Sequence, residues 1–503
     1  SLAQPFRVLA HNGEINTLKG NLNWMKAHET RITDDFFGDR VEDLKPILDS
    51  DASDSASLDA AFEILLQTDR SLPMTKSMII PESWSNNNDM PDELKKMYAY
   101  CNAVIEPWDG PAAVCANFGD WIISGMDRNG LRPLRYIITD DDLLISGSEV
   151  GMVIVDDKNI LKKGRVGPGE LIAINYKEKK FYQSDELKKQ LAKQNPYVEW
   201  NKNTILLDEI LDEQSATKPD NDNLENSKVI SKYFNYTIEV LDLILDPMAI
   251  SGQEALGSMG DDTPLSVLTD NYRGLHTFFK QNFAQVTNPP IDSLREQIVM
   301  SLKTRLGNLG NIADAEADQL NLVLLESPIL LDHELESLKL HLQKNTTEID
   351  CTYSKDLNKN FLQEIQRICS EAETAVRSGS QHIILTDKNI NENRISLPMI
   401  LITSAVHNYL IKNQLRTFTS LNVSSKECLD VHYFAVLIGV GATTVNASLV
   451  ESLIFERFEK GIYGTVNFDS LVLNFKKAIE KGLYLAHQTL LVKESTCEVQ
   501  SNE

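Results

Sequence analysis

The sequence is short of basic residues, of long apolar runs and of closely spaced cysteines. Its 503 residues include 49 Lys and Arg against 73 Asp and Glu, a formal net charge of −24. This charge argues against a nucleic-acid partner, because a phosphate backbone would be repelled. No apolar run reaches the roughly 20 residues that cross a membrane, and the start lacks the basic-then-apolar pattern of a secretory signal. We therefore expect a cytoplasmic protein with no membrane and no nucleic-acid partner.

The cysteines and histidines are scattered along the chain. No two cysteines have the C-x-x-C spacing, which indicates reduced thiols in a cytosolic protein and gives no support for a zinc or iron–sulfur site. His407 and His432 lie in apolar segments, where a core or supporting role is more typical than metal binding. We therefore expect no metal and no cofactor in this chain. The six cysteines are Cys101, Cys115, Cys351, Cys369, Cys428 and Cys497.

What the sequence does contain is enough apolar material for more than one core. Its length predicts two or three domains, and 42% hydrophobic with 24% charged residues is typical of a globular protein. From about Tyr176 to Asn226 the chain becomes polar and charged, as in a linker with a solvated helix. A new apolar pattern begins near Ser227. The sequence therefore predicts a domain on each side of this stretch.

A short motif near the start carries the first chemical signal. Asn12 and Gly13 follow a short extended segment and precede a helix predicted over 24–31. Asn-Gly is a strong turn signal, because both residues tolerate positive φ, and a loop that only turns the chain is the ordinary interpretation. The Asn12 side-chain amide and the Gly13 backbone N–H are also two adjacent hydrogen-bond donors. Such a pair is suited to hold the oxyanion of an acyl-transfer intermediate.

Two later segments place charged side chains at turns. Asp54 lies in a Ser- and Asp-rich stretch just before the apolar helical run 60–66, which is the signature of a helix N-cap. A carboxylate there is also suited to receive a substrate ammonium in a partly buried pocket. Residues 127–133 form a charged turn with Gly130 at its bend, and the arginines of this turn have a simple alternative role as partners of nearby acids.

The rest of the pattern predicts two kinds of sheet. Short apolar runs in the first half predict antiparallel strands, and the segment 72–92, with its three prolines, is expected to be a surface loop. In the second half, helices predicted at 331–342, 361–377 and 398–413 alternate with strands, which implies βα units and a mostly parallel sheet. The expected strands are 112–116, 121–125, 134–138, 143–146, 171–174, 322–325, 383–386, 419–423 and 434–439.

Two glycine-spaced runs fall short of nucleotide-binding loops. Gly257–Pro264 includes two aspartates, which would repel phosphate, and no Gly-Lys-Ser/Thr follows it. Gly439–Ala442 lacks the third glycine of a dinucleotide fingerprint. We interpret the first run as a structured turn and the second as a strand-to-helix turn.

Several of these motifs resemble those of the glutamate synthase family. His11–Thr17 followed by Asn21–Met25 resembles the family's glutaminase domain, a class II glutamine amidotransferase of the N-terminal-nucleophile type, and Asp127–Pro133 matches a second element of that domain. Gly257–Pro264 and Phe283–Asp292 resemble elements of the family's central domain. The resemblance implies an α+β and α/β fold: an incomplete four-layer αββα sandwich, followed by an α/β central domain with a mostly parallel sheet.

The resemblance also implies roles for individual residues. In the family the Asn and Gly form the oxyanion hole, so Asn12 and Gly13 would take that catalytic role, with Gly13 also contacting substrate. Asp54 matches the family aspartate that pairs with the α-ammonium of glutamine, while capping remains an alternative role for its serine neighbours. A supporting shell around the glutamine pocket is expected from His11, Asp127, Asn129 and Arg132.

The resemblance extends to roughly Gly482 and implies four parts of the chain. The cysteine nucleophile that heads the family's glutaminase domain, and the flavin barrel that holds FMN and a 3Fe–4S cluster, are expected to lie outside these residues. A fragment, an error in the gene model or a split gene would each explain this. The four parts are a partial glutaminase domain at 1–185, a linker at 186–226, a central domain at 227–482 and an unmatched polar tail at 483–503.

In the family, the cysteine hydrolyses glutamine, and ammonia passes through a channel to the flavin barrel. There it aminates 2-oxoglutarate with electrons from a nicotinamide cofactor or ferredoxin. The resemblance thus implies part of a glutamate synthase, with a possible partner chain that carries the flavin barrel. We expect it to be inactive alone, because an oxyanion hole without a nucleophile cannot form the thioester. The alternatives are a non-catalytic glutamine-binding module and a structural partner of a split synthase.

Overall fold

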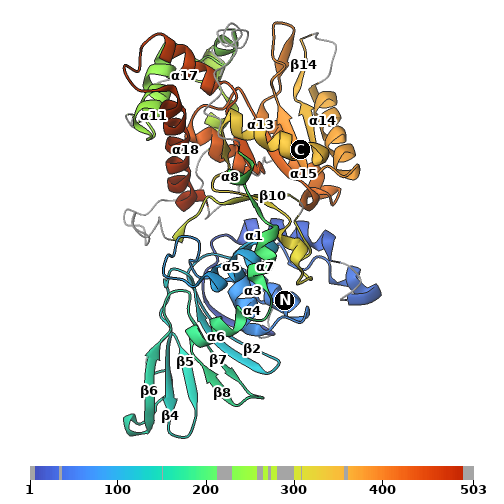
Figure 1. Ribbon diagram of the computed structural model, residues 1–503. Helices are drawn as coiled ribbons and strands as arrows, with labels where there is room; N and C mark the ends of the chain where they lie inside the picture. The colour runs from blue at the N-terminus through green and yellow to red at the C-terminus, as the bar shows by residue number, and fades with distance from the viewer. Residues whose placement is uncertain are drawn as a thin grey trace.

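A computed structural model gives the architecture. An N-terminal unit, from β1 (Leu9–Gly13) to the 3₁₀ helix η4 (Asn201–Asn203), lies below a C-terminal unit that begins at residue 229 (Figure 1). The expected motif Phe283–Asp292 and most of Gly257–Pro264 lie outside the described residues. The structure describes residues 6–32, 37–149, 151–211, 229–255, 257, 264–269, 273–279, 299–307, 309–355 and 361–490.

The N-terminal unit is built on a five-stranded antiparallel sheet in the order β1-β2-β3-β7-β8. β1 is an edge strand, and its register with β2 places Asn12 opposite Ala113 and Gly13 opposite Ala112. Side chains alternate between the two faces of the sheet: Ala112 and Val114 belong to one core cluster and Ala113 to another. The other strands are β2 (Ala112–Phe118), β3 (Trp121–Met126), β7 (Leu171–Asn175) and β8 (Lys180–Tyr182).

A layer of helices covers one face of this sheet and a second sheet covers the other. Met126 and Ile172 of the first sheet share a buried cluster with Tyr136 of the second sheet and with Leu134 and Val166, which flank its strands. The strand order of the second sheet is β5-β4-β6. These layers confirm the expected incomplete sandwich. The second sheet contains β4 (Arg135–Thr139), β5 (Leu144–Gly147) and β6 (Ile160–Arg165), and the helices are α1 (Leu18–His28), α3 (Asp54–Leu66), α4 (Leu72–Ile79), α5 (Asp92–Val104), α6 (Ser184–Leu191) and α7 (Tyr197–Trp200).

The prediction of a surface loop at 72–92 is wrong for its first half. All eight residues of α4 are buried. Ser71 caps the helix by accepting a hydrogen bond from the Met74 N–H at 3.4 Å, and Pro73 lies in the first turn. Proline is favoured there, because its missing N–H would have no partner in the helix. The prolines of this segment therefore mark the start of a helix and not only a loop.

The C-terminal unit is an α/β layer structure around a parallel five-stranded sheet in the order β12-β18-β17-β15-β13. The parallel sheet and the helices expected between its strands are confirmed. The strands are β12 (Ile329–Leu330), β13 (Thr346–Asp350), β15 (His382–Thr386), β17 (Ser420–Ser424) and β18 (Thr444–Asn446). The helices include α11 (Asp246–Ser251), α13 (Asp332–His341), α14 (Phe361–Arg377), α15 (Met399–Lys412), α16 (Val431–Gly439), α17 (Val450–Glu459) and α18 (Phe468–Leu490).

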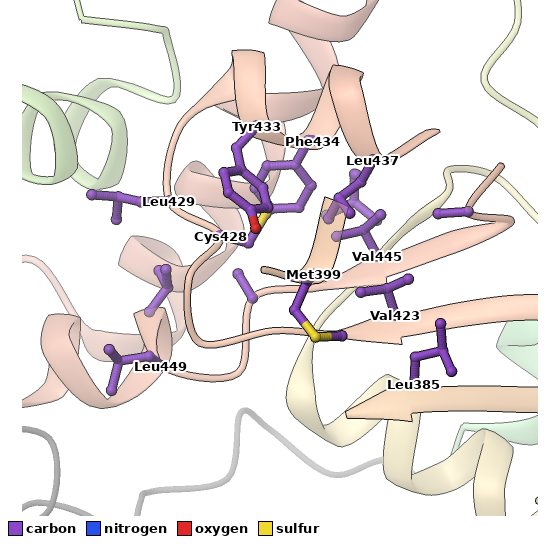
Figure 2. Close-up of a cluster of buried hydrophobic side chains, with 14 of the residues drawn as sticks. Leu385, Met399, Val423, Cys428, Leu429, Tyr433, Phe434, Leu437, Val445 and Leu449 are labelled. Carbon is purple, nitrogen blue, oxygen red and sulfur yellow. The ribbon is translucent and has the colours of Figure 1, made fainter. Parts of the chain in front are cut away.

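The strand predicted at 434–439 is wrong, because these residues belong to α16. A short run that is apolar on every side does not distinguish a buried helix from a strand. The local sequence signal for this helix is Asp430, whose carboxylate caps it by accepting from the Tyr433 N–H at 2.8 Å. Phe434 of α16 packs in the same buried cluster as Val445 (Figure 2). Gly439–Ala442 is consequently a helix-to-strand turn and not a strand-to-helix turn.

A segment before β12 connects the two units. β11 (Val323–Leu325), expected as part of the parallel sheet, instead pairs with β10 (Thr304–Leu306) and β9 (Ile205–Leu206) in a separate small sheet. Ile312 and Leu320 of this segment are buried in the core of the N-terminal unit. The hydrophobic core of the first unit therefore includes residues that follow the expected linker.

The start of the expected linker, at residue 186, and the start of the expected tail, at residue 483, both lie in helices. In α6, Leu187 and Leu191 are buried in the N-terminal core, so this part of the expected linker packs on the first unit. α18 continues to Leu490, eight residues past Gly482. None of the helices in the described part of the chain has both the length and the apolar character that crossing a membrane requires.

Candidate functional site

The Gly13 N–H lies outside the hydrogen-bond ladder between β1 and β2. Residues of an antiparallel pair alternate between bonded and non-bonded positions. Glu14 N donates to Pro111 O at 2.8 Å and Val8 O accepts from Asn117 N at 2.9 Å, which places the even-numbered residues of β1 in the bonded set. Gly13 is in the other set, so its N–H points away from β2 toward the open edge of the sheet.

A side chain at position 13 would not fit. A Cβ built on Gly13 would lie 1.8 Å from the Pro111 carbonyl oxygen and 2.8 Å from His11 Nε2. The strand can approach the 110–111 turn this closely only because residue 13 is glycine. The Gly13 N–H is therefore held in a fixed place by backbone packing.

The Asn12 side chain is held by Arg132. Arg132 Nη2 donates to Asn12 Oδ1 at 2.8 Å, and Arg132 Nε donates to the Asn12 carbonyl oxygen at 3.2 Å. The Asn12 Nδ2 group donates to Ser148 Oγ at 3.2 Å, just after β5. Asn12 thus presents Nδ2, a donor, on the side opposite Arg132.

His11 lies behind this pair and is shielded from solvent. Its Nδ1 is 2.8 Å from Ser55 Oγ and 4.0 Å from Asp54 Oδ2. Burial lowers the pKa of His11 from its ordinary value of 6.5, and Arg132 lowers it further while Asp54 and the Pro111 carbonyl oppose the shift. The imidazole is therefore neutral at pH 7, and it packs against the glycine strand without adding charge to the site.

Asp54 is the first residue of α3, and its carboxylate faces β1. Asp54 Oδ2 accepts from the Ile15 N–H at 2.9 Å, two residues after Gly13. The N-cap itself is Ser53, whose hydroxyl accepts from the Ala56 N–H at 3.2 Å. The Asp54 side chain is 21% exposed, so the carboxylate borders solvent at the edge where the Gly13 N–H points. At the start of α3, Ser53 therefore caps the helix, and Asp54 supplies the negative charge that faces β1.

The turn 127–133 lies beneath the site and is organised by Asp127. The buried Asp127 carboxylate accepts from the N–H groups of Ala112 at 3.0 Å, Asn129 at 2.9 Å and Leu131 at 3.2 Å. Asn129 is also buried, and its Oδ1 has no hydrogen-bond partner among the described residues. These two residues lie within the turn, whereas Arg132 reaches Asn12 directly.

The structure brings five of the residues named from the sequence to one edge of the sheet. They are His11, Asn12, Gly13, Asp54 and Arg132. Asp127 and Asn129 lie in the turn that carries Arg132. Two contact residues were not singled out individually: Ser55 beside His11 and Ser148 beside Asn12. Ser55 follows Asp54 in the same helix start, whereas no local signal marks Ser148.

Metal-binding side chains do not gather in the described part of the chain, where no group of three or more His, Cys, Asp or Glu is placed to hold an ion. The described cysteines are all free thiols, and four of the five are buried: Cys101, Cys351, Cys369 and Cys428. Burial raises the pKa of the Cys101 thiol to about 12, which keeps it protonated and unreactive. These cysteines therefore behave as core residues.

Comparison with known proteins gives two family matches. The class-II glutamine amidotransferase model matches residues 1–200, and the glutamate synthase central domain model matches residues 230–487. The large chain of NADPH glutamate synthase from Azospirillum brasilense is 51% identical over 485 residues, which cover 96% of this chain and 32% of the relative.

Two other relatives give nearly the same coverage. The large chain of NADPH glutamate synthase from Bacillus subtilis (strain 168) is 38% identical, over 96% of this chain and 31% of the relative. The ferredoxin-dependent glutamate synthase of Pyropia yezoensis is 38% identical, over 96% of this chain and 32% of the relative. The chain thus spans about a third of the length of these relatives. It belongs to the glutamate synthase family and contains that family's class II glutamine amidotransferase and central domain regions.

Proposed function

We propose that this chain binds glutamine at the edge of β1 and supplies the oxyanion hole for glutamine hydrolysis in a glutamate synthase. The observation that carries the proposal is the pair of donors at Asn12 Nδ2 and Gly13 N–H. The Oδ1 of the same Asn12 amide accepts from Arg132 Nη2 at 2.8 Å, and the Gly13 N–H is left out of the sheet ladder by its register. Asp54 lies on the same edge, with its Oδ2 2.9 Å from the Ile15 nitrogen.

The chemistry follows from where charge develops. When the family's cysteine attacks the glutamine carboxamide, the carbonyl oxygen becomes an oxyanion, and ammonia leaves as the thioester forms. Two fixed donors at that oxygen stabilise the transition state more than the ground state. Asp54 pairs with the α-ammonium of the substrate, which fixes the distance between the ammonium and the reacting carbon. His11 and the turn 127–133 support this arrangement from behind.

We assign the later steps to the remainder of the enzyme. The described cysteines are dispersed core residues and do not fit the three-thiolate ligand set of a 3Fe–4S cluster, so no step of the reaction is placed on such a cluster or on FMN in this chain. We propose that amination of 2-oxoglutarate to glutamate, with a nicotinamide cofactor or ferredoxin as electron donor, takes place in the parts of the enzyme that this chain does not span. We place the whole reaction in the cytoplasm.

Glutamine binding tests the proposal through Asp54. Calorimetric titration of the purified chain with glutamine should show binding, and Asp54→Asn should weaken it about 10-fold or more, because a charge-assisted hydrogen bond contributes about 1.5–3 kcal/mol. Asp51→Asn is the matched control: it makes the same chemical change at an exposed residue three positions earlier and should leave the affinity unchanged. Equal affinities of the wild type and Asp54→Asn would refute the assignment.

Ammonia release separates binding from catalysis. We expect the chain alone to bind glutamine without releasing ammonia. Cys115 is the described cysteine nearest in the ladder to the site, and it lies opposite Ala10 with its Sγ 3.4 Å from Ser124 Oγ. It is therefore engaged within the sheet and is not at the donor pair. Ammonia production by the purified chain at the rate of a complete amidotransferase would contradict this expectation.

A further inference from the structure

We propose that Arg132 is a positioning residue that fixes the side-chain amide of Asn12 with its donor toward the substrate. This inference rests on the proposed function, which it deepens by explaining how one of the two oxyanion-hole donors acquires its orientation. An asparagine amide has two orientations, related by a half turn, that exchange its oxygen and nitrogen. Only one of them places an N–H donor at the acyl oxygen, and the other would place a carbonyl oxygen against a developing negative charge.

The guanidinium decides between the two orientations. Arginine has five N–H donors and no acceptor, so the atom facing Arg132 Nη2 at 2.8 Å has to be Oδ1 and not Nδ2. The second bond, from Arg132 Nε to the Asn12 carbonyl oxygen at 3.2 Å, fixes the guanidinium plane against the backbone of the same residue. Through these two hydrogen bonds, the Arg132 guanidinium holds both the backbone and the side chain of Asn12.

The other neighbour of the amide does not make this choice. Ser148 Oγ, 3.2 Å from Asn12 Nδ2, belongs to a hydroxyl that can either accept or donate. It is compatible with both orientations. Without Arg132, the two orientations would differ little in energy, and a population with the wrong one would reduce the donor strength of the site.

The fold places Arg132 by tying its turn to the partner strand of β1. The Asp127 carboxylate accepts from the Ala112 N–H at the start of β2 and from the Asn129 and Leu131 N–H groups. Gly130 has a φ of +67°, and a Cβ there would lie 2.7 Å from Pro168 Cγ, so the turn closes tightly at this point. Arg132 follows two residues later, and its side chain reaches Asn12 of β1, the strand that pairs with β2.

Arg132 has an alternative role, direct binding of the substrate, that predicts a different experimental result. Arg132 is partly exposed, and a direct ion pair with the carboxylate of glutamine would also make it contribute to binding. The two roles differ in their dependence on Asn12. A residue that acts through Asn12 contributes nothing once Asn12 is removed, whereas a residue that contacts the ligand itself contributes in either background.

A double-mutant cycle on the full chain tests this. Glutamine affinity is measured by calorimetry for the wild type, Asn12→Ala, Arg132→Leu and the double variant. With the two orientations nearly equally populated, about half of the molecules keep the donor in place, so we expect Arg132→Leu to weaken binding at least about 2-fold in the wild-type background and not measurably in Asn12→Ala. Equal losses in the two backgrounds would overturn the proposal. Arg135→Leu, at an exposed arginine three residues further on, is the control and should change neither affinity.

A second measurement needs no ligand. In ¹⁵N NMR spectra of the free chain, the Asn12 side-chain NH₂ resonances should shift and exchange faster with solvent in Arg132→Leu, but not in Arg135→Leu. Arg132→Lys keeps the charge and loses the two-pronged fork, so it should give an intermediate change, and it serves in place of Arg132→Leu should that variant misfold. Unchanged Asn12 resonances would overturn the proposal. Absence of glutamine binding by the wild type would instead refute the proposed function and leave this measurement decisive for Arg132.

Discussion

At the scale of single residues, Lys76 is the least usual feature of the N-terminal unit. It lies on α4 with 1% of its surface exposed, under β3 at Gly125, where a Cβ would lie 2.8 Å from Lys76 Cε. Burial lowers the pKa of Lys76 from 10.5 to about 7, and Lys188 adds to the shift while Glu82 and Asp127 oppose it. Lys76 thus places a titratable charge next to the carboxylate that organises the turn of Arg132.

The sign of its pH dependence follows from the lowered pKa. Between about pH 7 and 10.5 the unfolded chain binds more protons at Lys76 than the folded chain does, so this residue makes stability rise with pH. The cost of burying the charged amine is complete below pH 7 and absent above 10.5. Lys76→Met should therefore increase the free energy of unfolding by about 1–4 kcal/mol at pH 7, and by less at pH 10.

Urea denaturation of the wild type and of Lys76→Met at the two pH values checks this prediction. Lys177→Met, at an exposed lysine of the same unit, is the control and should have the same small effect at both. A difference between Lys76→Met and the wild type that does not change with pH would show that the residue is not a buried titrating amine.

At the scale of elements, the strand that carries Asn12 and Gly13 is held from two sides. β2 pairs with one edge of β1. At the start of β1, the buried Asp59 carboxylate of α3 accepts from the N–H groups of three consecutive residues, Arg7, Val8 and Leu9, at 2.9, 2.9 and 3.0 Å. Buried backbone N–H groups that lie outside a sheet ladder need other hydrogen-bond partners. One carboxylate supplies them and sets the position of the strand relative to α3.

Asp59→Asn should consequently loosen β1. An amide keeps one acceptor oxygen and puts an NH₂ group against backbone donors, so we expect a loss of about 2–4 kcal/mol in the free energy of unfolding. Faster amide hydrogen exchange at Val8 and Leu9 should accompany it. Glu63→Gln, one turn further along α3, breaks only the 2.5 Å ion pair with the Arg7 side chain, which is 75% exposed, and should cost less than about 1 kcal/mol. Comparable losses in the two variants would argue against a special role for Asp59.

At the scale of the whole molecule, the two units are joined through the segment that precedes β12. Leu309 N donates to Thr417 O of the C-terminal unit at 2.9 Å, while Ile312 and Leu320 are buried in the N-terminal core. The contact continues at α1, where the Arg416 guanidinium carbon lies 5.5 Å from the centroid of the Trp24 ring. The α1 helix begins five residues after Gly13, so this contact surface is close in sequence to the candidate site.

Leu320→Ala should therefore lower the stability of the N-terminal unit, although Leu320 follows the expected linker in the sequence. The side chain is 2% exposed, and its removal from a packed core costs about 2–5 kcal/mol. Hydrogen exchange should increase in α5, which contacts the 3₁₀ helix η8 (Ala317–Leu320). Leu340→Ala, at a residue 67% exposed, is the control. Unchanged protection of α5 in Leu320→Ala would mean that the N-terminal core is complete without this segment.

The sequence by itself determined what depends on a few neighbouring residues. The N-cap before α3 and the amphipathic run of α14 are local signals, since capping bonds and helical periodicity act over one or two turns. The turn that the Asn-Gly pair predicts is wrong: Asn12 and Gly13 lie in β1, and neither has a positive φ. The same local motifs identified the family. They named five of the residues that meet at the β1 edge, although not the contacts among them.

The tertiary structure decided which segments meet and on which side. Residues 434–437 are buried in the cluster that packs on the parallel sheet, and a run that is apolar on every side does not distinguish helix from strand without that packing and the Asp430 cap. Arg132 meets Asn12 across 120 positions, and Ser148 meets it across 136. Such contacts depend on the register of β1 with β2 and on the packing of the second sheet. These are properties of the assembled fold, because a strand shifted by one residue would turn every side chain to its opposite face.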